Sequence, residues 1–308
     1  MNKLTERWAN TFILVCGIIW GIQALTLIPL RNIGLSSIQI FFWRQLISVL
    51  SLALLFFIKD RRIFKIALRD LPHMISIGAG CVLPQGPLYY IAIEQVGAAV
   101  SCALYYAALT VTIVLSALIL GERISFKKIA VITAVVFGSF LTTGIFTDGL
   151  KNVPVQGVLL SFVVGITYGM YGILSKIAMR KYRAETITFY GFLFSFIAVI
   201  FFTDLPETVA LVNSSGKLIT VIAFALFCSV LPYSLFTLGL TATESSKAAI
   251  MTSIDLPVAT AAGIIFLNEH SSAEKIIGIV MILLANLAMQ LGPCQTQKPR
   301  KPKINKNF

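Results

Sequence analysis

Apolar runs separated by short polar segments follow one another along the whole chain. Each run is close to the ~20 mostly apolar residues that a helix needs to cross a bilayer. The pattern therefore predicts an all-α polytopic membrane protein with ten transmembrane helices and no soluble domain. These helices are expected near residues 9–30, 36–58, 71–93, 97–120, 127–146, 154–175, 184–203, 218–240, 245–267 and 272–291.

The ten runs fall into two sets of five that share landmarks. Residues 17–21 read Gly-Ile-Ile-Trp-Gly and residues 165–169 read Gly-Ile-Thr-Tyr-Gly, each in the first run of its set. Leu120-Gly121-Glu122 ends the fourth run, and Leu267-Asn268-Glu269 ends the ninth. Because five is odd, the second set must cross the membrane in the opposite direction, so we predict two inverted five-helix repeats. In carriers of this architecture the substrate site lies between the halves, near the bilayer midplane. The expected parts are an N-terminal segment at 1–8, a first repeat at 9–146, a linker at 147–153, a second repeat at 154–292 and a basic tail at 293–308.

Charge placement predicts the orientation of the helices. Only 12% of the residues are charged, against about 25% in a typical soluble domain. Most of the 25 lysines and arginines fall on the side that holds both termini, and the positive-inside rule makes that side the cytoplasm. The net charge of +12 therefore reflects topology and argues against nucleic-acid binding. The basic loops and tail are expected to contact anionic lipid headgroups. The opposite side holds only Arg31, Lys151, Lys217 and Lys275.

The sequence lacks the motifs that catalysis, cofactor binding or ion conduction would need. It has no His-Glu-x-x-His pair and no glycine-rich phosphate loop, so we predict neither an enzyme nor a cofactor. A channel filter would need a repeated polar lining, which is missing as well. Lipid flipping leaves little trace in a sequence and stays open as an alternative. Five cysteines lack metal-ligand spacing, so no metal site is expected: Cys16, Cys81, Cys102, Cys228 and Cys294.

Several short motifs carry a resemblance to one transporter family. They are Trp20-Gly21, Tyr168-Gly169, Arg44, Tyr89-Tyr90-Ile91-Ala92, Leu256-Pro257-Val258, Glu122 and Glu269. On these motifs the chain resembles the ten-helix members of the drug/metabolite transporter superfamily, which are built from two EamA-type repeats. The resemblance implies an inner-membrane carrier that moves a small metabolite, usually outward, by alternating access.

The chain departs from that family pattern in two places. Thr110 stands where a proline is expected in the fourth helix, opposite Pro257 of the ninth. Asp255 precedes Pro257 by two residues, which the general pattern does not include.

Polar and aromatic residues share faces of the first helix of each repeat. Residues three apart lie on one helix face, so Trp20 and Gln23 point the same way. At the repeat offset, Tyr168 corresponds to Trp20, and Tyr171 corresponds to Gln23. Polar side chains are too costly to leave facing lipid, so these faces should line a cavity or an interhelical contact.

The third, fourth and ninth helices add to the same prediction. Tyr105 belongs to a polar stripe on the fourth helix, and the counterpart stripe on the ninth contains Thr252 and Asp255. Gln85 of the third helix falls opposite Pro232 of the eighth at the repeat offset. The candidate substrate-binding residues are Trp20, Gln23, Arg44, Gln85, Tyr89, Tyr105, Tyr168, Tyr171, Thr252 and Asp255.

Arg44 and Asp255 are charged residues within predicted helices. Each would cost about 2.5–3.5 kcal/mol if it faced lipid without a partner, so both should point inward. They could pair with each other, bind the two ends of a zwitterion, or leave Asp255 to take up a coupling proton. We favour contact with a zwitterion and predict an exporter of an amino acid or related metabolite. An importer of a sugar or nucleoside is an alternative.

Glu122, Glu269 and four prolines predict features at helix ends and breaks. Each glutamate is expected to accept hydrogen bonds from free backbone amides at the N-terminus of the next helix, where the helix dipole favours an anion. Prolines delete a backbone hydrogen bond and kink a helix, so kinks are expected at Pro84, Pro87, Pro232 and Pro257.

Overall fold

Helices make up nearly all of the regular structure. The computed structural model describes residues 5–96, 98–122, 124–143, 154–266 and 272–290, and these contain no strand. In chain order the helices are α1 (Glu6–Asn32), α2 (Ser37–Lys59), α3 (Leu71–Ile75), α4 (Leu83–Gln85), α5 (Pro87–Val96), α6 (Ala98–Leu120), α7 (Phe126–Thr142), α9 (Val155–Ala178), α10 (Ala184–Ile200), α11 (Leu205–Leu211), α12 (Ser215–Ala225), α13 (Leu231–Leu240), α14 (Ser245–Thr252), α15 (Asp255–Phe266) and α16 (Ala273–Gln290).

Each of the ten predicted segments carries a helix or a chain of consecutive helices. By length and apolar composition, five helices of the described residues can cross a membrane, or up to seven if each of two bent pairs counts as one span. Helix α1 bends by 41° between Gln23 and Leu25. Pro29 lies one turn further on and cannot donate to the carbonyl of Leu25, which accounts for the bend.

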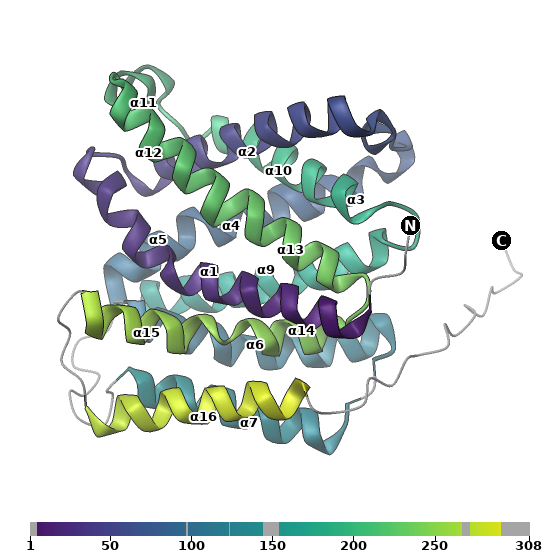
Figure 1. Cartoon of the computed structure of the whole chain (residues 1–308), viewed down its shortest axis with the longest axis vertical. Coiled ribbons are helices and arrows are strands. Elements are labelled where there is room, and N and C mark those ends of the chain that lie inside the picture. Colours follow the sequence, from purple (N-terminus) through teal and green to yellow (C-terminus); the bar gives the residue numbers. More distant parts are fainter. Residues whose placement is uncertain (1–4, 97, 123, 144–153, 267–271, 291–308) are drawn as a thin grey trace, which may run out of the picture.

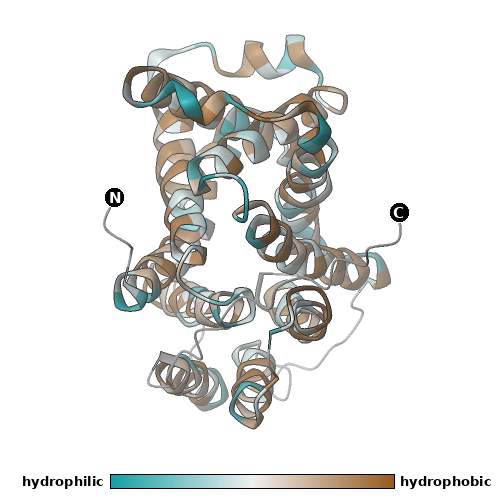
Figure 2. Cartoon of the chain, turned by 90° about the vertical axis from the view of Figure 1, so that its right-hand side faces the viewer, coloured by the Kyte–Doolittle hydropathy of each residue, from teal (hydrophilic) through white to brown (hydrophobic). Residues whose placement is uncertain are grey.

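The outer surface of the helices is apolar, as a lipid-facing surface must be. Brown, apolar positions dominate the helices in Figure 2. Large side chains such as Leu118 and Ile58 are 76% and 78% exposed. In a soluble protein these side chains would belong in the core, so their exposure fits a chain dissolved in a bilayer.

The two repeats interleave rather than fold separately. Helix α1 packs on α13 and α15, and its counterpart α9 packs on α5 and α6. Two further pairs join equivalent helices of the two halves: α2 with α10, and α7 with α16 (Figure 1). This symmetric set of contacts confirms the two-repeat arrangement.

A hydrogen-bonded contact shows that the repeats are inverted. Glu122, just after α6, accepts from the backbone amides of Ser245 and Ser246 at distances of 2.8 and 3.2 Å. The end of α6 therefore lies beside the start of α14. Since α14 and α15 run on to Phe266, the fourth and ninth segments end at opposite ends of the molecule.

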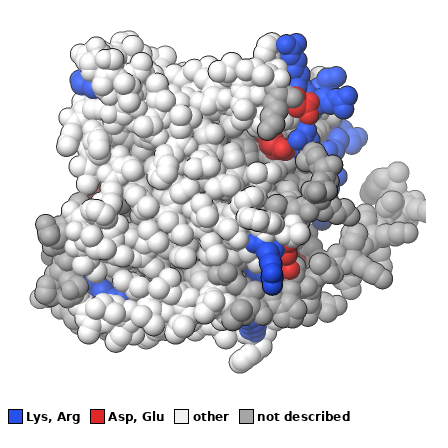
Figure 3. Space-filling model, viewed as in Figure 1, with Lys and Arg blue, Asp and Glu red and all other residues white. Residues whose placement is uncertain are grey.

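The loops form two separate groups of contacts, one at each end. At one end, Arg183 pairs with Asp60, Lys181 with Asp70 and Lys247 with Glu6. The hydrogen bonds from Lys181 and Tyr182 lower the pKa of Asp70. At the other end, Arg31 pairs with Glu94, and Gln39 donates to Glu207. The grouping agrees with the predicted sides, and Figure 3 shows lysine and arginine gathered at the end where α1 begins.

The third and eighth segments carry the same irregularity at equivalent places. In each segment a π-helical stretch comes directly before a Leu-Pro pair. The stretch is Ser76–Val82 in the third segment and Leu226–Val230 in the eighth. Pro84 and Pro232 are therefore equivalent, which corrects the sequence alignment by one position. The counterpart of Gln85 is Tyr233, not Pro232, and the Tyr233 hydroxyl donates to the Gln85 Oε1 atom at 3.1 Å.

The ninth segment is broken, whereas its counterpart is continuous. Helix α14 ends at Thr252 and α15 begins at Asp255. Pro257 cannot donate to the carbonyl of Ser253, so the hydrogen-bond ladder stops there. Helix α6 carries Thr110 at the equivalent position and runs unbroken from Ala98 to Leu120.

Glycines in α1 and α9 let the halves approach closely. A Cβ atom on Gly21 would lie 2.5 Å from the backbone oxygen of Asp255, and one on Gly169 would clash with the side chain of Thr112. The sequence motifs at these glycines therefore serve backbone contact between the repeats.

We expect single cysteines at Ile124 and Ala273, in a background with the native cysteines replaced, to label from opposite sides of the membrane. Both positions are exposed. They flank the fifth and tenth segments at equivalent points, which the inverted arrangement puts on opposite faces. The measurement is modification by a membrane-impermeant maleimide in sealed vesicles. Labelling of both from the same side would contradict the inverted architecture.

Gly21→Ala should destabilise the protein by about 1–3 kcal/mol, because the added methyl group meets fixed backbone. Gly80→Ala is the matched control, since no atom lies within 4 Å of a Cβ at Gly80. The thermal unfolding midpoint in detergent measures both. Equal midpoints for the two variants would exclude close backbone packing at Gly21.

Candidate functional site

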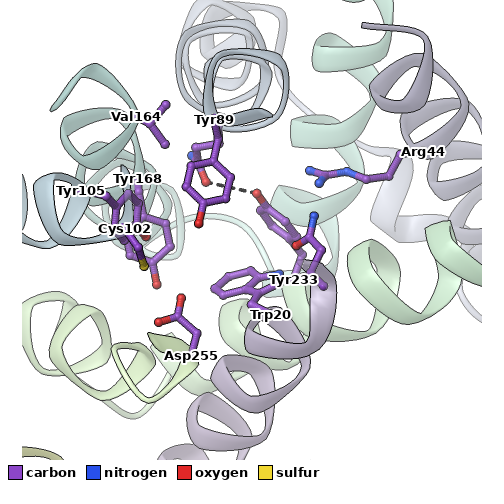
Figure 4. Close-up of a pocket in the computed structure, with 11 residues that line it drawn as sticks. Trp20, Arg44, Tyr89, Cys102, Tyr105, Val164, Tyr168, Tyr233 and Asp255 are labelled. Atoms are coloured by element: carbon purple, nitrogen blue, oxygen red, sulfur yellow. Dashed lines mark hydrogen bonds between the residues drawn. The ribbon is translucent and has the colours of Figure 1, made fainter. Parts of the chain in front are cut away.

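A cavity lies between the two repeats, about halfway along the helices. We call it the central cavity, and its volume is about 80 Å³. Helices α1, α2, α4 and α5 contribute to it, as do α6, α9, α13 and α15 (Figure 4). It is lined by Trp20, Gln23, Arg44, Gln85, Tyr89, Cys102, Tyr105, Val164, Tyr168, Tyr233 and Asp255.

Eight of the ten candidate residues line the central cavity. The other two, Tyr171 and Thr252, are fully buried behind it. Thr252 shares a hydrogen bond of 2.6 Å with the Tyr168 hydroxyl, and Tyr171 shares one of 2.9 Å with Thr237. Neither residue lines the central cavity in this conformation. For all ten residues, substrate binding stays a prediction.

Arg44 is 3% exposed and points into the central cavity from α2. Its Nη1 atom donates to the Tyr90 hydroxyl at 3.1 Å, and that hydroxyl also accepts from Gln23 at 2.9 Å. The guanidinium carbon lies 5.0 Å from the centre of the Phe41 ring, within range of a cation–π interaction. The Arg44 Nε atom is buried and has no hydrogen-bond partner within the described chain.

Asp255 enters from the opposite wall, at the first residue of α15. The break before α15 puts Asp255 at a helix N-terminus, where the positive end of the helix dipole favours a carboxylate. Its Oδ1 atom accepts from the Tyr106 hydroxyl. Over the described residues, Arg44 and Asp255 make no ion pair with each other. The structure therefore does not support mutual pairing in this conformation.

Aromatic rings form the wall between the two charges. Trp20 meets the Tyr168 and Tyr233 rings edge-on, with centroids 5.9 and 5.2 Å apart. The Tyr105 ring lies 5.4 Å from Tyr168 and 6.3 Å from Tyr89. Such walls suit small solutes with an apolar part and a few fixed polar groups.

Five residues at the site were not predicted from the sequence. Tyr233, Cys102 and Val164 line the central cavity, and Tyr90 and Tyr106 bond the two charges. The Leu-Pro alignment of the third and eighth segments would have found Tyr233. Tyr90 and Tyr106 each follow a predicted tyrosine by one residue, and the helical repeat turns them about 100° away from it.

A second, larger cavity continues from the central cavity toward one end of the molecule. Its volume is about 290 Å³, and it shares Trp20, Gln23, Tyr89, Cys102 and Asp255 with the central cavity. Thr142 at the end of α7 and Lys275 in the first turn of α16 also line it. The larger cavity therefore extends away from the end that holds Glu122.

The end that holds Glu122 is closed by polar contacts between the halves. The Lys128 ammonium lies 2.6 Å from Glu244 and donates to Ser246 at 2.8 Å, with side chains mostly buried. Within the second repeat, Lys176 donates to the backbone oxygens of Leu240 and Thr243 near the same end.

The structure corrects the helix assigned to Glu122. Glu122 bonds the N-terminus of α14 in the other repeat rather than that of the next helix, α7. Ser125 already caps α7 by accepting from the Lys128 amide, so α7 does not need the glutamate. Glu269 lies outside the described residues.

Metal binding has no support in the described part of the chain, where no cluster of three or more histidine, cysteine, aspartate or glutamate side chains could hold a metal ion. The fold and the site instead define a multi-pass membrane transporter with inverted repeats around a central cavity.

The EamA-like transporter family model matches residues 7–144 and 155–289, and the chain belongs to this family. An uncharacterized transporter of Archaeoglobus fulgidus is 26% identical over 195 residues, covering 63% of this chain and 68% of the relative. The uncharacterized transporter YwfM of Bacillus subtilis is 24% identical over 233 residues, covering 71% and 74%. A protein of known crystal structure shares the fold, with a TM-score of 0.71 at 13% identity, over 91% of this chain and 95% of that chain.

Tyr90→Phe should destabilise the protein by about 1.5–3 kcal/mol, because it removes a hydrogen bond to the buried charge of Arg44. Tyr171→Phe is the matched control and should cost about 0.5–1.5 kcal/mol, since it removes a bond between neutral hydroxyls. Chemical or thermal unfolding of the two purified variants measures the difference. A Tyr90→Phe protein as stable as Tyr171→Phe would show that this bond does not stabilise Arg44.

Proposed function

We propose that this chain is a secondary transporter that exports a small zwitterionic metabolite, such as an amino acid, by alternating access. The substrate would bind in the central cavity, with its carboxylate toward Arg44 and its ammonium toward Asp255. The chain would work as a carrier and not as an enzyme, with neither cofactor nor ATP.

One observation carries the proposal. Two opposite charges face one cavity from opposite walls, and each is held by a tyrosine hydroxyl instead of by the other charge. A zwitterion brings the two complementary charges and would take up the buried Nε–H of Arg44, which lacks a partner in the described chain. An uncharged sugar or nucleoside would leave both charges without a counter-ion, which is costly in an apolar surrounding.

The one-sided opening supports alternating access as the mechanism. The larger cavity leads from Asp255 toward one end, while contacts around Glu122 and Lys128 close the other. The π-helical stretches of the third and eighth segments and the break in the ninth lie next to the central cavity and provide places where the halves can bend. Rocking about these breaks would close one end and open the other.

Orientation and direction form part of the proposal. We propose that the protein lies in the inner membrane, with its basic end and both termini in the cytoplasm. The basic loops would then contact anionic lipid headgroups. The larger cavity then opens outward. Export follows the expectation for the family.

Purified protein in liposomes tests the proposal. Vesicles preloaded with unlabelled amino acids should take up labelled amino acid by counterflow, and a parallel assay should find no scrambling of a reporter lipid. Scrambling without counterflow would support a flippase. Counterflow confined to sugars or nucleosides would support the importer alternative and end the zwitterion proposal.

Arg44→Gln and Asp255→Asn should each lower the counterflow rate about tenfold or more, since each removes a charge-assisted contact with the substrate. Arg31→Gln is the control for the arginine, because Arg31 pairs with Glu94 at the membrane edge, away from the cavity. Substrate binding and counterflow rates are measured on variants that have been shown to be folded. A wild-type rate in Asp255→Asn would remove Asp255 from the mechanism.

A further inference from the structure

The larger cavity differs from the central cavity in the chemistry of its walls. The walls beyond the shared residues are mainly apolar and come mostly from α1, α5, α6 and α15, with Thr142 of α7 and Lys275 of α16 at the end away from the central cavity. The polar exceptions are Tyr90, Thr142, Thr260 and Lys275. The Thr142 and Thr260 hydroxyls already donate to the carbonyls of Ser139 and Leu256, at 2.7 and 2.9 Å. The Tyr90 hydroxyl accepts from Gln23 and Arg44. The apolar wall residues include Leu25, Leu27, Ile93, Val96, Val100 and Leu256.

One face of α15 joins the charge to this apolar space. Asp255, Ala259 and Gly263 are four residues apart, so they lie on one face, and all three line the larger cavity. The side chains shrink along this face, from a carboxylate to a methyl group to hydrogen. A molecule whose ammonium meets Asp255 therefore has room to extend along the helix past Ala259.

The two charges determine which end of such a molecule stays in the central cavity. Arg44 lines the central cavity and is absent from the lining of the larger one, whereas Asp255 lines both. A carboxylate at the buried Nε–H of Arg44 and an ammonium at Asp255 would point the remaining substituent of the α-carbon into the larger cavity.

We propose that the larger cavity is the side-chain subsite of the transporter and that it selects amino acids with extended apolar side chains. This inference rests on the proposed function, because it assumes that the zwitterionic group binds between Arg44 and Asp255. Polar side chains would lose water along the apolar walls, where the hydroxyls of Tyr90, Thr142 and Thr260 already have hydrogen-bond partners, and this disfavours them.

The expected size of the effect follows from the apolar area buried. Each methylene group transferred from water into the larger cavity should tighten binding about fourfold. The series glycine, alanine, 2-aminobutyrate, norvaline and norleucine adds one carbon at each step. Dissociation constants for this series on the purified wild-type protein should fall steadily.

Three comparisons on the wild-type protein can overturn the proposal. Equal affinities along the series would leave the zwitterion site standing and exclude the apolar subsite. Glutamine binding as tightly as norleucine would exclude selection against polar side chains. Hexanoate matches norleucine in chain length but lacks the ammonium, so equal binding of hexanoate would assign the cavity to an acyl chain instead.

A larger side chain in the wall of the larger cavity tests the subsite directly, with the same substitution at an exposed position as its control. Ala259→Leu should abolish the gain in affinity from alanine to norleucine while glycine binds as to wild type. Ala130→Leu, the same change at an exposed position of α7, should keep the full gain. If Ala259→Leu keeps the full gain in affinity, the side chain of the substrate must bind outside the larger cavity. If no member of the series binds wild type, the proposed amino-acid function itself fails, and the subsite with it.

Discussion

A charge inside a bilayer must find its partners within the protein, and the arrangement of this chain depends on how Arg44 and Asp255 do so. Arg44 is held by Tyr90, and Asp255 is held by Tyr106 at the start of a helix. Neither contact neutralises the charge, so two opposite charges stay available on facing walls. A buried ion pair between them would have fixed the helices but left nothing for a ligand.

Symmetry places these groups, and departures from symmetry give them their roles. The third and eighth segments meet through Gln85 and Tyr233, which occupy equivalent positions. Asp255 lacks such a counterpart, because Ala108 stands at the equivalent position of the fourth helix. The break at Pro257 is equally one-sided, since Thr110 leaves α6 continuous. The repeats thus supply a common frame, and single residues make the two halves chemically different.

Local patterns in the sequence predicted what local physics decides. Apolar length located the helices, and the spacing of Trp20, Gln23 and Tyr105 predicted the face that lines the cavity. The partners of these faces depend on packing between distant segments, which no local pattern contains. For that reason the α14 amides that bind Glu122, the burial of Thr252 behind Tyr168 and the roles of Tyr90 and Tyr106 emerged only in three dimensions.

The interleaving of the repeats has a consequence for biosynthesis. Helix α1 packs mainly on α13 and α15, so its partners leave the ribosome some 200 residues later. Until then the glycine face of α1 lacks its final surroundings, and the first five helices wait in the membrane as an unfinished half. Assembly is therefore completed only after the last helices have been inserted, and a chain cut at the middle would yield two fragments that each need the other to fold.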